Sequence, residues 1–309
     1  MDTQRVPMDH GVGSGASRSA QRSAHVKSAS RALDIIEVLA SERTGLAFTD
    51  IARLEQIPKS SLHALLAVLT ERGFVEFDPQ SRSYSLGIRT WEMGQAYLAH
   101  RDLVEKALPL MQQVVAAINE TVQLAVLDGI ENVYLAKVDC SHPVRLQSEV
   151  GRRLFAHATG LGKVLLAELP EDIARSRFSE STLAKLSAQT IQDPDRLFDA
   201  LTYIRARGFA VDNQEYTAGL RCVAVPIVGA EGHAIAALSA SIPITRAGPD
   251  EMTEALRHIA SASIDISRRL GVSTPDQRLA SLTQWRGDVM AQEPDGSDRR
   301  LVTGPTGIG

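Results

Sequence analysis

The chain of 309 residues is 44% hydrophobic and 23% charged, a composition that excludes a wholly disordered protein and leaves room for two globular domains. A formal net charge of -4 excludes binding to nucleic acid through overall charge, so such binding would need a local surface. Two cysteines, Cys140 and Cys222, exclude a disulfide framework, and the apolar runs fall far short of the roughly 20 residues of a membrane-spanning helix, so we expect a cytoplasmic protein.

Residues 1–27 contain many Gly, Ser, Ala, Arg and Gln residues and almost no large apolar ones. Such a segment cannot bury enough surface to offset the entropy lost on ordering. We expect a flexible arm, whose basic residues would suit contact with DNA as well as plain solvation.

Residues 28–73 show the apolar spacing of three short helices. The first covers about 28–41, the second starts near Thr49, and the third runs from Lys59 to Gly73 after a break at Ile57-Pro58. Three short helices with this spacing predict a helix-turn-helix. The residues expected to face inward are Ala32, Leu33, Ile36, Leu39, Ala40, Ile51, Ala52, Leu54, Leu62, Leu65, Leu66 and Leu69.

Two β-prone runs, 74–77 and 83–87, follow the third helix and predict a hairpin, that is, a wing. Residues 28–87 are therefore interpreted as a winged helix-turn-helix DNA-binding domain. Its third helix would enter the major groove with Lys59, Ser60, Ser61 and His63 outward, the first three near phosphates and His63 near a base edge. Because residues 28–90 are nearly neutral, a winged helix that binds a protein remains the alternative, and DNA affinity would depend on a dimer.

Residues 88–102 are predicted to form a linking helix. Ile88, Trp91, Gln95 and Leu98 are spaced 3, 4 and 3 residues apart, as in a short coiled-coil seam. A tryptophan on such a seam favours a partner helix over solvent, so we predict a homodimer.

Residues 103–271 predict an α+β domain of the sensor type, an antiparallel sheet with helices before, within and after it. An amphipathic helix is expected over 103–119 and another from Asp250 onward. The expected strands are 121–128, 132–139, 144–150, 209–212, 221–228 and 233–241. Residues 272–309 lose this periodicity and are expected to form a mostly flexible tail, apart from docking of Trp285.

A glycine-rich turn lies within residues 151–169. Gly160 and Gly162 leave amide groups uncovered at the start of an apolar helix, and Lys163 adds a cation, so the turn suits a small anion. The phosphate-loop pattern fails, because its first glycine and its Ser or Thr are replaced by His157 and Val164.

His157, Asp212 and Cys222 admit an enzymatic, a metal-binding or a redox interpretation. No two of them have the short spacing of a zinc site, and a cysteine on an apolar strand is usually a small core residue. We therefore expect no catalysis, no metal and no cofactor.

Four separated segments carry a family resemblance: SASRALDIIEVLA, FTDIARLEQIPKSSLHALLAVLTERGFVEFD with YSLG, GRRLFAHATGLGKVLLAEL, and RGFAVDNQEYTAGLRCVAVPI. In this order they resemble the IclR-type bacterial transcriptional regulators over most of residues 28–271. The resemblance implies a winged helix-turn-helix, a dimerising linker helix and an effector-binding domain related to GAF and PAS folds. It also implies operator binding as a dimer or a dimer of dimers, altered by a small metabolite, often an organic acid.

The resemblance also implies an effector pocket, in which backbone and hydroxyl donors in an apolar cavity would suit a small carboxylate. The residues carried over are Gly160, Leu161, Asp212, Cys222, Ser239 and Ser241, with Leu146, Leu154 and Leu220 as the apolar wall.

The sequence departs from the family pattern at three places. Leu161 replaces the common Ala, Phe155-Ala156 lacks the usual Pro, and Ala64 stands where the family usually has Arg. The first two put the smallest ligands of the family in doubt. The third places more of the DNA contact on the third helix and on Arg82 of the wing. The sequence leaves repression or activation open.

Overall fold

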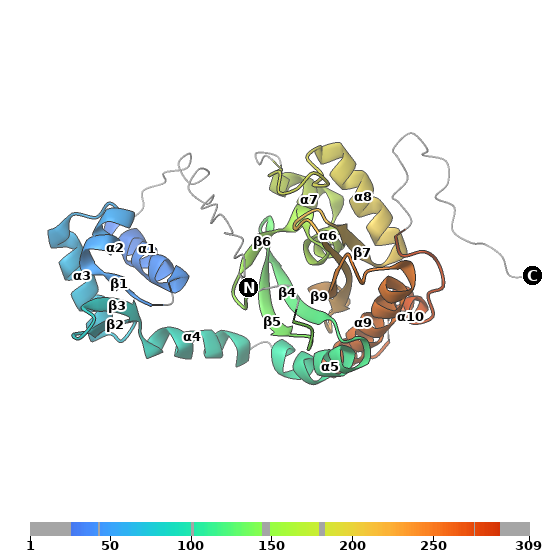
Figure 1. Cartoon of the computed structure of the whole chain (residues 1–309), viewed down its shortest axis with the longest axis horizontal. Coiled ribbons are helices and arrows are strands. Elements are labelled where there is room, and N and C mark those ends of the chain that lie inside the picture. The colour runs from blue at the N-terminus through green and yellow to red at the C-terminus, as the bar shows by residue number, and fades with distance from the viewer. Residues whose placement is uncertain are drawn as a thin grey trace, which may run out of the picture. The chain divides into compact units, whose positions relative to one another are not determined.

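The computed structural model describes residues 26–42, 44–99, 102–143, 149–178, 183–274 and 276–290. The chain divides into two units, Met1–His100 and Arg101–Gly309, whose elements are labelled in Figure 1. No helix in these described ranges is long and apolar enough to cross a bilayer.

The N-terminal unit contains three helices, a small sheet and a fourth helix. The elements are α1 (Lys27–Ser41), β1 (Leu46–Ala47), α2 (Phe48–Leu54), α3 (Lys59–Glu71), β2 (Val75–Asp78), β3 (Ser83–Leu86) and α4 (Ile88–Ala99). The antiparallel sheet has the order β1-β3-β2, so the predicted wing is confirmed and gains a two-residue third strand.

The core of this unit forms where the apolar faces of α1, α2 and α3 meet. Its buried residues are Ile35, Leu39, Ile51, Ile57, Leu62, Leu66, Leu69 and Val75. Three predicted core residues are wrong, because Leu33 is 60% exposed, Leu54 is 49% exposed and Ala40 is exposed as well. The apolar stripe read from the sequence is therefore wider than the face that the helices bury.

The C-terminal unit is built on a six-stranded antiparallel sheet in the order β6-β5-β4-β9-β8-β7. Its strands are β4 (Thr121–Asp128), β5 (Glu131–Val138), β6 (Arg153–Phe155), β7 (Ala210–Asn213), β8 (Leu220–Val228) and β9 (Ala234–Pro243). Its helices are α5 (Leu103–Ile118), α6 (Gly160–Ala167), α7 (Glu171–Phe178), α8 (Pro194–Arg207), α9 (Pro249–Arg269) and α10 (Gln277–Leu282), with a 3₁₀ turn at Ala156–Ala158.

The two faces of this sheet differ in chemistry. Helices α5 and α9 cover one face, and α6 covers the other with α8 packed on it, as Figure 1 shows. Because strand side chains alternate between faces, Val122, Leu124, Val223 and Leu238 lie in the apolar core under α5 and α9. Their neighbours along the strands face α6, and several of these are polar.

The predicted strand over 144–150 is wrong where the structure describes it. Residues 149 and 150 are not strand, and residues 144–148 lie outside the described residues. The edge strand is instead β6, where Leu154 pairs with Asn132 of β5. Three residues are too few for the alternation that identifies a strand in a sequence.

The expectation of a flexible tail from residue 272 is wrong for residues 276–290. Leu279, Leu282 and Val289 are buried there, while residues 291–309 lie outside the described residues. Trp285 docks edge-on against Phe209, with ring centroids 5.3 Å apart, as expected. The segment orders because it covers apolar surface that the rest of the unit leaves open.

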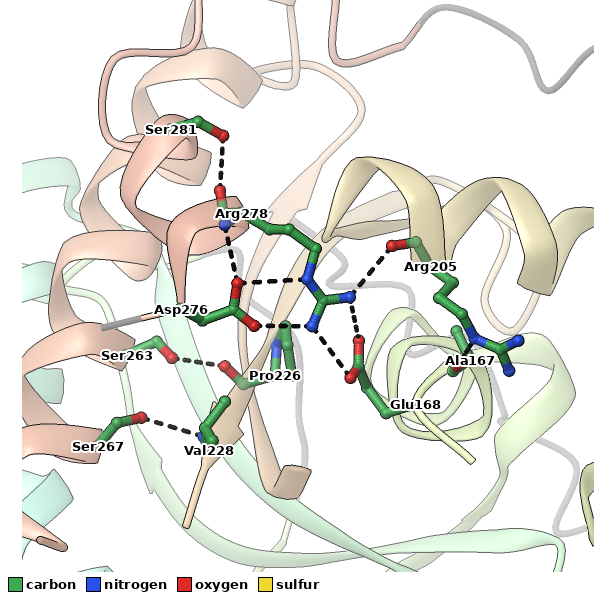
Figure 2. A network of polar contacts seen from close by, with 10 residues as sticks. All are labelled: Ala167, Glu168, Arg205, Pro226, Val228, Ser263, Ser267, Asp276, Arg278 and Ser281. Carbon is green, nitrogen blue, oxygen red and sulfur yellow. Dashed lines mark hydrogen bonds and ion pairs between the residues drawn. The ribbon is translucent and has the colours of Figure 1, made fainter. Parts of the chain in front are cut away.

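Polar contacts hold this C-terminal segment to the unit (Figure 2). Arg278 donates to Glu168, which follows α6, and to the carbonyl oxygen of Arg205 in α8, at 3.0 and 3.1 Å. Asp276 accepts from the same guanidinium at 2.7 Å. One side chain thereby joins α10 to the two helices that cover the partly polar face of the sheet.

Candidate functional site

Helix α3 presents a polar face to solvent. Leu62, Leu66 and Leu69 turn inward, which leaves Lys59, Ser60 and His63 exposed and Ser61 half-buried. A cation, hydroxyl groups and an imidazole at the first turns of an exposed helix can contact phosphates and base edges.

The tip of the wing is held by its own side chains. Asp78 accepts hydrogen bonds from the Gln80 amide at 2.9 Å and from the Ser81 hydroxyl at 2.6 Å. These bonds lower the pKa of the Asp78 carboxyl, the Ser81 bond most. Arg82 follows with a φ of 54° and is exposed, so the hairpin fixes the backbone from which this side chain extends.

The C-terminal unit carries a row of buried polar side chains on the face of the sheet under α6. Strand register places Asp212 opposite Cys222, Cys222 opposite Ser241, and Ser239 opposite Gln123. We call these five residues, Gln123, Asp212, Cys222, Ser239 and Ser241, the polar floor. The sequence brought four of them forward; Gln123 is the fifth, and the polar-apolar alternation along 121–126 is the signal that would have found it.

The polar floor is joined by hydrogen bonds. Ser241 and Ser239 donate their hydroxyls to Gln123 Oε1 at 2.8 and 3.1 Å, and Cys222 Sγ lies 3.2 Å from Ser241 Oγ. One amide oxygen from β4 therefore orients two hydroxyls of β9. A ligand that accepts from either serine would compete with Gln123.

The first turn of α6 lies directly on the polar floor. A Cβ at Gly160 would stand 3.3 Å from Ala224 Cβ, 3.6 Å from the Asp212 nitrogen and 3.7 Å from the Cys222 oxygen. Glycine therefore lets the helix begin in contact with β7 and β8, with Thr159 as its capping residue.

The sequence predicts an open amide at Gly162, and this prediction is wrong, because Gly162 is needed for close packing. Its amide donates to Thr159 Oγ1 at 3.0 Å, and a Cβ there would stand 2.2 Å from Ala156 Cα. The amides of Gly160 and Leu161 are the ones that lie at the very start of the helix, where its dipole favours an anion.

The sequence predicts that Lys163 supplies a cation to a bound anion, but in the structure this side chain is paired within the protein. It is 1% exposed and forms an ion pair with Glu215, between α6 and the link from β7 to β8. The Glu215 amide in turn donates to Asp212 Oδ1 at 2.7 Å. Burial, and then the charge of Glu215, raise the pKa of Asp212 against the opposing effect of Lys163.

Cys222 and His157 make their hydrogen bonds to other groups, Cys222 with Ser241 and His157 with Ala184. Burial, and then the charge of Asp212, raise the pKa of the Cys222 thiol, which disfavours the reactive thiolate. Burial lowers the pKa of His157, whose Nε2 lies 3.1 Å from the carbonyl oxygen of Ala184. Each side chain is thus engaged elsewhere, and the described residues contain no group of three His, Cys, Asp or Glu arranged for a metal.

Tyr134 of β5 adds a phenol near the polar floor. Burial raises the pKa of its hydroxyl, and the charges of Cys222 and Asp212 act in the same direction. It packs in the same apolar cluster as Leu154 and Leu161. Leu220 is also buried, at the start of β8, whereas Leu146 lies outside the described residues.

Two family descriptions match the chain. The one described as "Bacterial transcriptional regulator IclR C-terminal" matches residues 95–268, and the one described as "IclR helix-turn-helix domain" matches residues 28–79. The second description spans α3 and part of the wing, and the first spans the described members of the proposed site.

Curated relatives match most of the chain. The HTH-type transcriptional regulator XynR of Escherichia coli (strain K12) is 33% identical over 80% of this chain and 98% of its own length. The HTH-type transcriptional regulator BhcR of Paracoccus denitrificans (strain Pd 1222) is 35% identical over 81% of this chain and 88% of its own length.

Among solved structures, an IclR homologue from Microbacterium hydrocarbonoxydans complexed with 4-hydroxybenzoate has a TM-score of 0.71. It is 27% identical and covers 79% of this chain and 98% of its own. The similarity thus extends over both units, including the sheet that carries the polar floor.

Proposed function

This chain belongs to the IclR family of bacterial transcriptional regulators, and we propose that it binds operator DNA as a dimer and releases or tightens that DNA when an organic acid binds. We assign DNA binding to residues 28–87, dimerisation to 88–102 and effector binding to 103–271. The observation that carries the effector proposal is the polar floor, a buried polar row beneath the first turn of a helix.

The proposed DNA surface consists of Lys59, Ser60, Ser61 and His63 on α3, with Arg82 at the wing. Lys59 and the serines supply the phosphate contacts, and His63 reads a base edge. Ala64 offers no polar group of its own to a base, so we expect modest affinity per protomer and strong dependence on the dimer.

The proposed effector is a small organic acid whose carboxylate faces the amides of Gly160 and Leu161. Amides at a helix start and the helix dipole favour an anion. A raised pKa favours the neutral form of Asp212, which would repel the carboxylate less than an ionised one. Cys222, Ser239, Ser241 and Tyr134 offer further polar contacts, and the 4-hydroxybenzoate complex of a relative agrees in ligand class.

The proposed apolar wall includes Leu146, Leu154, Leu161 and Leu220. Leu161 is the distinguishing residue, because its side chain is larger than the usual Ala and is 3% exposed. We expect it to narrow the apolar part of the site and so to select among ligand bodies, while the carboxylate stays at the α6 start. Replacement by Ala should change the order of preference among organic acids.

The signal would pass as a population shift. Closure of the α6 start on the effector would favour one arrangement of the dimer and so one spacing of the two recognition helices. Ile88 and Trp91 of α4, 61% and 62% exposed, supply the apolar surface for the partner subunit.

Thermal-shift measurements with a set of aliphatic and aromatic acids test the effector proposal. A ligand at 100-fold excess over its Kd should stabilise the protein by about 2.7 kcal/mol. Ser241→Ala should weaken the shift, while Ser176→Ala, at an exposed position of α7, serves as the control. A set in which no acid stabilises the protein, or in which Ser241→Ala and Leu161→Ala change nothing, would contradict the placement of the site.

A further inference from the structure

The segment 276–290 lies C-terminal to the family match, which ends at residue 268. Its place on the unit is set by Arg278, which contacts Glu168 and Asp276 and the carbonyl oxygen of Arg205 (Figure 2). Burial of Leu282 and Val289 adds apolar contact. This segment therefore lies outside the family match and has a defined position on the unit.

The end of this segment forms one wall of a cavity of about 440 Å³. Cavities that hold small molecules measure roughly 300–1,000 Å³, so this one has room for a ligand. Its walls come from the 188–191 stretch, including Ala188, from α8, from β7 and the residues after it, and from the C-terminal segment. No member of the polar floor lines it, although the amide of Glu215, a lining residue, donates to Asp212. The walls of this cavity therefore differ from those of the proposed effector site.

The charges along this cavity favour an anion. Arg196 lies in the first turn of α8 and is exposed, and the ion pairs of the described residues do not include it. Arg207 lies at the other end of α8, where its guanidinium stands 4.2 Å from the Phe209 ring and 4.6 Å from the Tyr203 ring. The acid in the lining, Glu215, is already paired with Lys163.

The remaining walls suit a ligand with an apolar body. Ile191, Val211, Val289 and Met290 supply aliphatic surface, and Gln189 and Asn213 supply amides. Guanidinium groups bind carboxylate and phosphate oxygens with paired hydrogen bonds. We propose that this cavity is a second ligand site, which takes a small organic anion with an apolar ring or branched chain.

The fluorescence of Trp285 can report ligand binding in the cavity. Trp285 packs on Phe209, which also contacts Arg207, and the chain has only one other tryptophan, Trp91. In full-length protein carrying Trp91→Phe, the emission therefore comes from Trp285 alone. Benzoate and phenyl phosphate are the two probes, and they distinguish a carboxylate from a phosphate ligand.

We expect saturable change of the Trp285 emission with at least one probe. Arg196→Gln should raise the apparent Kd at least tenfold, and Ala188→Phe should do the same by filling space without a change of charge. Arg257→Gln, an exposed substitution on α9 away from the cavity, is the control and should leave the Kd unchanged.

Three results would overturn the inference: no response to either probe, an unchanged Kd in Arg196→Gln, or loss of the response in Ser241→Ala. The last result would assign the ligand to the polar floor instead. Because DNA binding and its effector response are measured separately, failure here would leave the proposed regulator function standing.

Discussion

Asp212 is the residue at which burial and ligand chemistry meet. Its carboxyl is 3% exposed and close to Glu215, so the folded protein holds a proton there above the pH at which an unfolded chain would release it. A neutral acid beside amide donors can accept or donate a hydrogen bond without repelling a carboxylate. The state of Asp212 is therefore part of the specificity of the proposed site.

The stability of the Asp212→Asn variant relative to wild type should increase as pH rises. A raised folded pKa means that the wild-type protein loses stability from about pH 4 upward, because the unfolded state releases its proton first. Asn lacks this loss, so the free energy of unfolding of the variant relative to wild type should increase between pH 5 and pH 8. We expect this increase to exceed about 1.4 kcal/mol, which is the equivalent of one pKa unit. Chemical denaturation at each pH measures it.

The control for that titration is Asp199→Asn, at an exposed position of α8. A difference between Asp212→Asn and wild type that stays flat over the same pH range would contradict the raised pKa.

Lys163→Met should destabilise the protein strongly, because it leaves Glu215 as a buried charge without its partner cation. Loss of one member of a buried pair typically costs about 3–5 kcal/mol. The double variant Lys163→Met with Glu215→Leu should recover much of that loss, since both charges are then gone. Denaturant unfolding measures both, with Lys185→Met at an exposed position as the control, and a Lys163→Met variant as stable as the control would contradict a structural role for the pair.

Helices and strands are predicted well from the sequence where they are long enough for their apolar periodicity to repeat. The runs 121–128 and 221–228 alternate or stay apolar long enough to be identified as strands, and the structure has β4 and β8 there. Strand β6 and helix α10 are three and six residues long, too short for either period to repeat. Their formation depends on neighbours that are distant in the sequence.

Some residues of the candidate site can likewise be identified from the sequence, and others cannot. Gly160, Asp212 and Cys222 belong to family motifs that the sequence contains, and the structure places the first turn of α6 against both strand residues. Gln123 is a different case, because Ser239 lies 116 residues away and meets it only through strand register. The pairing of Lys163 with Glu215, 52 residues apart, was invisible for the same reason.

Helix α10 should contribute measurably to the stability of the C-terminal unit. Leu282 is fully buried, so Leu282→Ala should lower the free energy of unfolding by about 2–5 kcal/mol. Ser281→Ala, exposed on the same helix, should change it little. Differential scanning calorimetry measures both, and a Leu282→Ala variant with an unchanged Tm would restore the expectation of a flexible tail.

At the scale of the whole molecule, a regulator needs two DNA-binding units held at a set spacing. Ile88, Trp91 and Met93 expose large apolar surface on α4, the last described helix of the N-terminal unit. Such a surface on a single helix is best explained by a partner helix. The dimer proposed above thus rests on α4.

Trp91→Glu should shift the protein toward monomer and weaken DNA binding, because the charge would have to be buried against the partner. Sedimentation velocity at micromolar concentration measures the first effect. Glu92→Gln, an exposed neighbour on α4, is the control and should remain dimeric. A Trp91→Glu variant that sediments as wild type would move the dimer contact away from this helix.

We propose that this chain is a DNA-binding regulator whose affinity for its operator changes when a small acid binds. Fluorescence anisotropy of full-length protein with labelled DNA from beside its own gene, at moderate salt and with unlabelled competitor, tests it most directly. We predict sequence-dependent binding that Lys59→Gln and His63→Ala weaken, and a several-fold change in Kd with any acid that raises the Tm. Equal affinity for operator-region and unrelated DNA, with and without such acids, would contradict the claim and favour a winged helix that binds protein.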